Sequence, residues 1–409
     1  MTTITVDVAV APRRSFQEVW VISLGHALTH WYPATFYLLL PLIGKELGLS
    51  YSEIGAVLTC QYFAGAIANI PGGIFVDTVG RKGLLMAASL FWIGFPYLIM
   101  GFSHAYWMIL ACATLVGIGN NLWHPSAIPW LANRFPQRKG LVMSIHGMGG
   151  NVGDAVAPLV AGALLGFMSW RDVVVINVVP GVLIAAFALI YLGRRQNGED
   201  AVSADAAPKI SAAERVRMFG ALLKNRALIT LAAGSAFRTM TQGALLTFLP
   251  LYLARQMGYP PLWIGACMFA LQAGGFIAAP IAGHLSDRVG RRQIILSSMA
   301  MSAIVIFLML FAGGTGWFVM FVSVLGFFLF AVRAVLQAWL LDATPPAMGG
   351  SAIGLLFASQ AFGQAVGPVS AGIVADHYGL MSAFYFLAGT IVVANFLVFV
   401  TPAGLMKRD

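Results

Sequence analysis

Apolar residues run through this chain in long stretches, separated by short segments that collect charged residues, Gly and Pro. The charge-free stretches 83–103, 173–193 and 293–332 are examples. A helix needs ~20 apolar residues to cross a bilayer, so the spans between charges and breaks predict twelve membrane helices. They cover 18–44, 53–77, 83–103, 106–133, 138–168, 172–193, 227–254, 261–286, 293–313, 316–341, 347–376 and 380–402. The pattern predicts an all-α integral membrane protein.

Composition and charge placement agree with a membrane protein. Hydrophobic residues make up 59% of the 409 residues and charged residues 10%, unlike a soluble domain. Most of the 24 Lys and Arg residues fall in alternate connecting segments, on the side that also holds both termini. This positive-inside bias predicts cytoplasmic termini. The net charge of +9 therefore points to the bilayer as partner and not to nucleic acid.

A ten-residue pattern, G-x3-D-x2-G-R-[KR], occurs at 73–82 and again 210 residues later at 283–292. Each copy lies between two long apolar runs. We expect its first Gly to permit close helix contact, its second Gly to allow a tight turn, and its Asp to pair with a nearby basic residue. The repeat predicts two halves, 1–193 and 227–409, joined by a polar connector at 194–226 that carries a short helix on the membrane surface.

A second landmark repeats at the same spacing. Gly153-x3-Ala157-Pro158-x2-Ala161-Gly162 corresponds to Gly363-x3-Gly367-Pro368-x2-Ala371-Gly372. We interpret the chain as a duplicated unit of six helices.

The repeated ten-residue pattern resembles the loop signature of the major facilitator superfamily. That resemblance implies two pseudo-symmetric six-helix bundles, alternating access around a central cavity, and a conformational latch in the two loops. The latch residues would be Gly73, Asp77, Gly80, Arg81, Gly283, Asp287, Arg288, Gly290 and Arg291. Gly25-His26, His124-Pro125 and 149–153 resemble bacterial exporters of the fosmidomycin-resistance type, which implies a multi-pass protein of the bacterial inner membrane. Thr78 stands where that family usually has a basic residue.

Ionisable residues inside membrane helices normally face a cavity or a partner. The first span carries His26, His30 and Tyr37 at helical spacing, so both imidazoles share a face. Asn120 and His124 lie one turn apart in the fourth span, where Pro125 should loosen the helix by freeing the Asn121 carbonyl. In the fifth span Asp154 lies about halfway across the bilayer, and His146 precedes it. We predict that Asp154, His26 and His146 carry protons.

Arginines occur inside two spans of the second half, each one turn from a glutamine. Subtracting the repeat spacing puts Arg238 and Arg333 near the depth of His30 and His124. Two arginines against one carboxylate favour an anion, because the guanidinium suits carboxylate, phosphate or phosphonate. The predicted substrate-binding residues are Arg238, Arg333, His30, His124, Asn120, Gln242, Gln337 and Tyr37. The leading hypothesis is proton-coupled export of a small organic anion or anionic drug.

Two other functions stay open at this point. A divalent transition-metal carrier could use His26, His30, His124, His146 and Asp154, since imidazole and carboxylate suit such ions. A receptor or assembly factor could use the same fold without moving cargo. An enzyme is not expected, because the chain shows no nucleophile–base pair, metal motif or nucleotide-binding loop. We expect no cofactor beyond a proton gradient, and a functional monomer.

Overall fold

The computed structural model describes residues 16–402 except 121, 197–219, 221–223 and 345–348. Its helices are α1 (Gln17–Glu46), α2 (Tyr51–Val79), α3 (Lys82–Gly101), α4 (Tyr106–Asn120), α5 (Trp123–Arg134), η1 (Pro136–Arg138), α6 (Lys139–Leu164), α7 (Trp170–Gln196), α9 (Arg226–Arg255), α10 (Pro261–Val289), α11 (Arg291–Ala312), α12 (Gly316–Asp342), α13 (Gly349–Tyr378) and α14 (Ser382–Phe399). With α4 and α5 taken together as one crossing, the described helices match the twelve predicted spans. The prediction of an all-α membrane fold is confirmed.

Seven of the described helices are long and apolar enough to cross a membrane by length and composition alone. The helices α1, α6 and α9 fall outside that set, and they are the ones that place His30, Asp154 and Gln242 around a central cavity. A helix that faces water on one side needs fewer apolar residues than one surrounded by lipid.

The fourth predicted span is interrupted rather than continuous. The first piece, α4, ends at Asn120, and α5 begins at Trp123. Pro125 lies in the first turn of α5, where its missing N–H leaves no helical hydrogen bond unmade. The sequence located this irregularity correctly but predicted a kink instead of two helices. The Asn121 carbonyl lies outside the described residues, as does the predicted surface helix of the connector, apart from Gly220.

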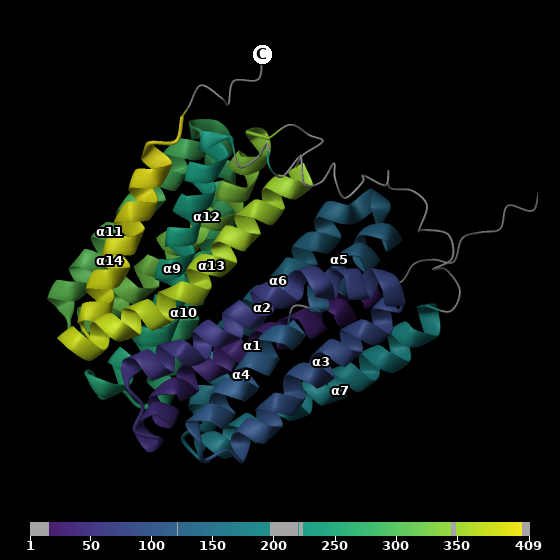
Figure 1. The fold of residues 1–409 in the computed structure, drawn as a ribbon, viewed down its shortest axis with the longest axis horizontal. Helices are drawn as coiled ribbons and strands as arrows, with labels where there is room; N and C mark the ends of the chain where they lie inside the picture. Colours follow the sequence, from purple (N-terminus) through teal and green to yellow (C-terminus); the bar gives the residue numbers. More distant parts are fainter. Residues whose placement is uncertain (1–15, 121, 197–219, 221–223, 345–348, 403–409) are drawn as a thin grey trace, which may run out of the picture.

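The helices form two groups, α1–α7 and α9–α14, which lie against each other (Figure 1). Within each group the repeat is visible in backbone contacts. Gly153 of α6 packs on the Ala27 carbonyl of α1, and Gly363 of α13 packs on the Ala236 carbonyl of α9 in the same way. Glycine permits this approach because a Cβ at either position would overlap the facing carbonyl.

The two groups meet through glycines near one end of the bundle, which we call the closed end. Gly55 of α2 faces Pro368 of α13, and Gly265 of α10 faces Pro158 of α6. These two contacts are equivalent in the repeat, since each partner lies 210 residues from its counterpart. Gly162 against Pro261 and Gly372 against Tyr51 form a second equivalent pair.

The same four helices separate toward the opposite end, which we call the open end. A Cβ added at Gly73, Gly147, Gly283 or Gly354 would meet no atom within 4 Å. The close contact expected at Gly73 and Gly283 is therefore wrong for this conformation, because the helices that would supply it have moved apart. The expected turns are confirmed: Gly80 has φ 67° and Gly290 has φ 108°, a region that L residues avoid.

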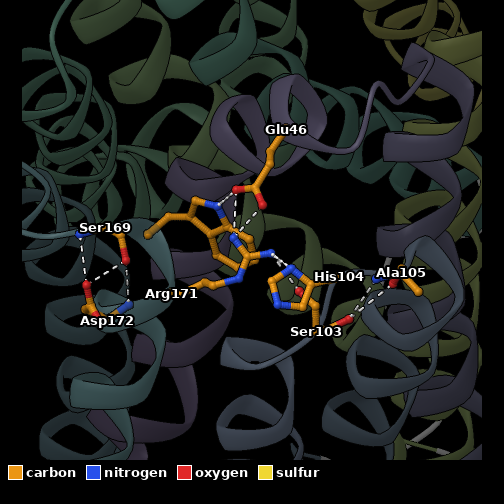
Figure 2. A network of polar contacts seen from close by, with 8 residues as sticks. Glu46, Ser103, His104, Ala105, Ser169, Arg171 and Asp172 are labelled. Carbon is orange, nitrogen blue, oxygen red and sulfur yellow. Dashed lines mark hydrogen bonds and ion pairs between the residues drawn. The ribbon is translucent and has the colours of Figure 1, made fainter.

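A polar network ties three segments of the first group together at the closed end (Figure 2). The Arg171 guanidinium donates to Glu46 Oε1 at 2.5 Å and to the Ser103 carbonyl at 2.8 Å, and Trp170 Nε1 donates to Glu46 Oε2 at 2.6 Å. Glu46 lies beyond the predicted membrane span 18–44. Hydrogen bonds from Trp170 and then Arg171 hold the pKa of the Glu46 carboxyl below its ordinary value.

We expect Glu46→Gln to lower the thermal unfolding midpoint at pH 6.5 by no more than a few degrees, because the pair is partly exposed. A carboxyl with a depressed folded pKa stabilises the fold above its unfolded pKa, and this contribution is lost as pH falls through the folded value. The difference between wild type and variant should therefore shrink below pH 4.5. Thermal unfolding of the detergent-purified proteins across pH checks this, with Arg171→Gln as partner variant. A difference that is independent of pH would contradict it.

Candidate functional site

A cavity of about 490 Å³ lies between the two helix groups. Both groups line it, and some of the lining residues are related by the 210-residue repeat. Tyr62 and Gln272 occupy equivalent positions, as do Asp154 and Gln364. The polar residues that line it are His30, Tyr37, Gln61, Tyr62, Asn69, Asn120, His124, Asn151, Asp154, Gln242, Gln272, Arg333, Gln337 and Gln364. This set offers hydrogen bonds on all sides, with one arginine and one carboxylate among them.

Arg333 of α12 is exposed to this cavity. Within the described residues it has neither an ion-pair partner nor a side-chain hydrogen bond. Gln337, one turn along α12, lines the cavity beside it. The two residues that the sequence places one turn apart thus both line the cavity, although they do not bond to each other.

Arg238 differs from the prediction. It is 1% exposed and is not among the cavity-lining residues. Its Nη1 donates to Gln242 Oε1 at 3.2 Å and to the Leu329 carbonyl of α12 at 3.3 Å. Arg238 thus lies behind Gln242, between α9 and α12, and reaches the cavity only through that glutamine.

In the first group, Asp154 of α6 pairs with His30 of α1. Nδ1 of His30 and Oδ2 of Asp154 are 3.0 Å apart, and both side chains are less than one-third exposed. The Tyr37 and Tyr62 hydroxyls form a hydrogen bond in the same wall. This arrangement puts a carboxylate and an imidazole in direct contact at the cavity surface.

His26 and His146 are buried behind this wall, and two cavity-lining histidines, His30 and His124, contact the His26 ring. The His26 and His146 rings stack with centroids 4.0 Å apart, and His124 meets His26 edge-on at 4.8 Å. The five residues proposed together for a metal thus form a contiguous cluster, in which ring nitrogens of His26, His124 and His146 converge and His30 bonds Asp154 instead. Neither His26 nor His146 contacts Asp154 through a hydrogen bond.

Several cavity residues were not singled out from the sequence. They are mainly glutamines and asparagines: Gln61, Asn69, Asn151, Gln272 and Gln364, with Tyr62. An amide side chain inside an apolar span could have indicated a cavity position. The 210-residue spacing of Tyr62 and Gln272, which puts two polar residues at equivalent positions of the repeat, supports the same conclusion.

The predicted latch of the second group forms an ion-pair cluster at the open end. Arg291 Nη1 lies 3.1 Å from Asp287 Oδ1, and Arg291 Nε also bonds Asp342 at the end of α12. Asp342 thus pairs with the basic latch segment of its own group. These contacts connect α10, α11 and α12 within one group. The side chain of Asp77, in the other copy, lies outside the described residues.

At the closed end a carboxylate bridges the two groups. The first two backbone N–H groups of α2, from Tyr51 and Ser52, donate to Asp376 Oδ1 and Oδ2 at 2.7 and 2.9 Å. Asp376 belongs to α13 of the other group. A carboxylate at a helix N-terminus satisfies unpaired donors and complements the helix dipole. The cap therefore stabilises the closed end.

Comparison with known proteins matches residues 22–278 and 263–408 to the family model of the Major Facilitator Superfamily. The chain belongs to that family. It is a multi-pass inner-membrane transporter and not an enzyme. The phosphoglycerate transporter protein of Salmonella typhimurium is 24% identical over 97% of this chain and 91% of its own. The fosmidomycin resistance protein of Escherichia coli is 24% identical over 89% and 88%. The structure of the nucleoside transporter NupG aligns with a TM-score of 0.79 at 15% identity over 94% and 99%.

We expect Asp376→Asn to weaken the closed end, because an NH2 group, which cannot accept a hydrogen bond, replaces one of the two carboxylate oxygens that accept from Tyr51 and Ser52, and the charge is lost. Loss of a helix cap costs ~1 kcal/mol, which corresponds to about a fivefold shift in the ratio of closed to opened molecules. The test measures distances between two spin labels by electron paramagnetic resonance. The labels are attached at Lys45→Cys and Gln256→Cys, in a background without Cys60, Cys112 and Cys267. Asp376→Asn should show a larger fraction of long distances than the protein with Asp376.

Asp172→Asn is the matched control. Asp172 caps α7 from within one group, through the Ser169 N–H and hydroxyl. The same increase in long distances for both variants would show that Asp376 has no special role between the groups.

Proposed function

We propose that this transporter exports small organic anions by alternating access, coupled to protons and acting as a monomer. The observation that carries the proposal is Arg333, a guanidinium exposed in the central cavity without an acidic partner among the described residues. A charge in that position is expensive unless water or a ligand stabilises it. An anionic cargo would supply the missing partner.

The surrounding groups fit an anion with hydroxyl or carbonyl oxygens. Gln242, Gln272, Gln337 and Gln364 all lie in the second group and line the same cavity. Their amides can donate to oxygen atoms around the charged centre. Arg238 adds a positive charge behind Gln242 without contacting the cavity. Two relatives are named for phosphoglycerate and for fosmidomycin resistance, and phosphoglycerate is an organic anion.

Proton coupling is assigned to Asp154. Among the described residues that line the cavity, Asp154 is the one with an acidic side chain, and His30 bonds to its carboxylate. The other titratable groups facing the same cavity are Tyr37, Tyr62, His124 and Arg333. Asp154 shares the cavity with Arg333, so cargo and proton would bind in the same cavity.

Alternating access is supported by the asymmetry between the two ends. Glycine contacts and the Asp376 cap join the groups at the closed end, and facing glycines at the open end have no neighbours. With both termini in the cytoplasm, as the charge distribution predicts, the cavity opens inward. A rocking motion of the two groups would then exchange the ends.

We expect Arg333→Gln to raise the KM for anions 10–100-fold, since hydrogen bonds to a charged group contribute ~1.5–3 kcal/mol. Arg238→Gln should have a smaller effect on KM, because that side chain does not line the cavity. The measurement is uptake of labelled phosphoglycerate and fosmidomycin into vesicles.

Arg226→Gln is the control, because Arg226 is exposed at the start of α9. A thermal-shift panel of anionic and neutral solutes supports the assay, since a ligand that binds the folded state raises its stability. Stabilisation by neutral solutes alone, or anion uptake by Arg333→Gln equal to wild type, would contradict an anionic cargo.

We expect Asp154→Asn to abolish accumulation driven by a pH gradient while leaving exchange of cargo across the membrane in place. The amide keeps a hydrogen-bonding group beside His30 but cannot release a proton. Proteoliposomes loaded with cargo, assayed with and without a pH gradient, separate the two activities. Asp172→Asn should keep both. Gradient-driven accumulation by Asp154→Asn would remove this residue from the coupling.

A further inference from the structure

Three histidines from three helices converge beside the cavity. His26 belongs to α1, His124 to α5 and His146 to α6. Each offers a ring nitrogen, and these nitrogens lie within 4.8 Å of one another. His26 is 6% exposed and His146 is 4% exposed, so both are shielded from lipid and from bulk water. The His30 ring also lies edge-on to His26, with centroids 4.8 Å apart, but Nδ1 of His30 is bonded to Asp154.

Hydrogen bonding sets the tautomer of His26. Its Nδ1 lies 2.6 Å from the His146 backbone carbonyl. A carbonyl oxygen only accepts hydrogen bonds, so Nδ1 carries the proton and Nε2 carries the lone pair. Metal-binding histidines commonly hold their second ring N–H on a carbonyl in this manner, which orients the ring and raises its basicity.

The ligand atoms of the triad have no hydrogen-bond partners among the residues that the structure describes. Nε2 of His26, Nδ1 of His124 and both ring nitrogens of His146 are buried without a hydrogen bond. A buried polar atom left unsatisfied costs ~1–3 kcal/mol, and this cluster contains several in one place. The stacked and edge-on rings bring lone pairs together, which is favourable only if a proton donor or a cation lies between them.

The backbone around the triad leaves room for these rings. A Cβ at Gly150 of α6 would lie 2.8 Å from His26 Cε1 and 3.1 Å from its Nε2. The glycine therefore allows His26 to reach the two other histidines. A similar approach at Gly25, where a Cβ would overlap the Trp123 ring, brings α5 against α1 beside the cluster.

We propose that His26, His124 and His146 bind one borderline transition-metal dication, of the class that includes Zn²⁺ and Co²⁺. Neutral imidazoles suit these ions. An ion with nitrogen ligands at about 2.0–2.1 Å needs those atoms roughly 3.4 Å apart, so small rotations of the rings would close the site. Three protein ligands leave a fourth position for water or another donor. The site would join α1, α5 and α6 within the first group.

The type of donor atom argues against Mg²⁺ and Ca²⁺, which require oxygen ligands. The triad supplies only nitrogen, and the nearest carboxylate, Asp154, is bonded to His30. Arg333 lies in the shared cavity, so the three imidazole bonds must outweigh its repulsion, as they can for a strongly coordinated ion. The inference does not depend on the identity of the cargo.

The test uses the full-length protein, purified with its affinity tag removed and stripped with a chelator. We expect one Co²⁺ per monomer, with the visible absorption of a four-coordinate site. Cu²⁺ electron paramagnetic resonance should show splitting from three nitrogens. His26→Gln and His146→Gln should each weaken Co²⁺ binding at least tenfold. Neither residue lines the cavity, so binding of an anion on Arg333 serves as a check that these variants fold.

The control variant replaces His104, His284 and His377 by Gln together, because these exposed histidines lie outside the triad. It should bind Co²⁺ as wild type does. The proposal fails if stripped wild type takes up no Co²⁺, if His26→Gln and His146→Gln bind it unchanged, or if only the exposed-histidine variant loses it. Should the single variants unfold, the Cu²⁺ electron paramagnetic resonance spectrum of the exposed-histidine variant replaces them. A spectrum without splitting from three nitrogens would overturn the site.

Discussion

A bilayer core contains no water to stabilise a charge, and this constraint decides where the ionisable side chains of these helices lie. An arginine at the middle of a membrane helix costs ~2.5–3.5 kcal/mol on the mildest scale. Arg333 and Asp154 avoid lipid by facing the cavity, and Arg238 does so by bonding Gln242 and a carbonyl of α12. The central opening between the two groups is therefore required by the residues that it contains, as well as by transport.

The closed end is held by close backbone contacts together with the Asp376 cap. Gly55 against Pro368 and Gly265 against Pro158 bring helix axes together along smooth surfaces. Surfaces of this kind separate without moving bulky groups, which suits an end that must open in each cycle. Gly73 and Gly283 have no neighbours at the other end. We infer that they provide equivalent surfaces when the open end closes, which would reconcile the sequence expectation with this conformation.

The sequence predicted the helices and the duplication well, because both depend on patterns spread over many residues. It predicted the facing of single side chains less well. His26 and His30 share a face as predicted, with ring centroids 4.8 Å apart. The sequence did not show that His30 would bond Asp154 while His26 packs on His124 and His146, because α1 crosses α5 and α6 at that level. Neighbouring helices decide such contacts, and one residue of helix already rotates a side chain by ~100°. Periodicity alone could not show that Arg238 lies behind Gln242.

The neutral amides were missed for a different reason. Burying a charge within an apolar span costs so much free energy that its presence indicates a functional site or a partner. This cost singled out Arg333 and Asp154 in the sequence. Glutamine costs less, and it can satisfy its own amide on a nearby carbonyl. Gln272 and Gln364 therefore gave a weak signal, although they share the cavity with Arg333.

The two halves have diverged at equivalent positions, and the divergence separates their chemistry. Asp154 and His146 in α6 correspond to Gln364 and Leu356 in α13, and His124 in α5 corresponds to Ala334 in α12. In the opposite direction, Arg333 corresponds to Trp123. The first half thus holds the groups that can gain or lose a proton or bind a metal, and the second holds the fixed positive charge.

Because the cavity lies between the halves, a ligand on Arg333 and a proton on Asp154 would act on different rigid groups. Binding of either could then alter the relative position of the two halves, which is the requirement for coupling one gradient to another.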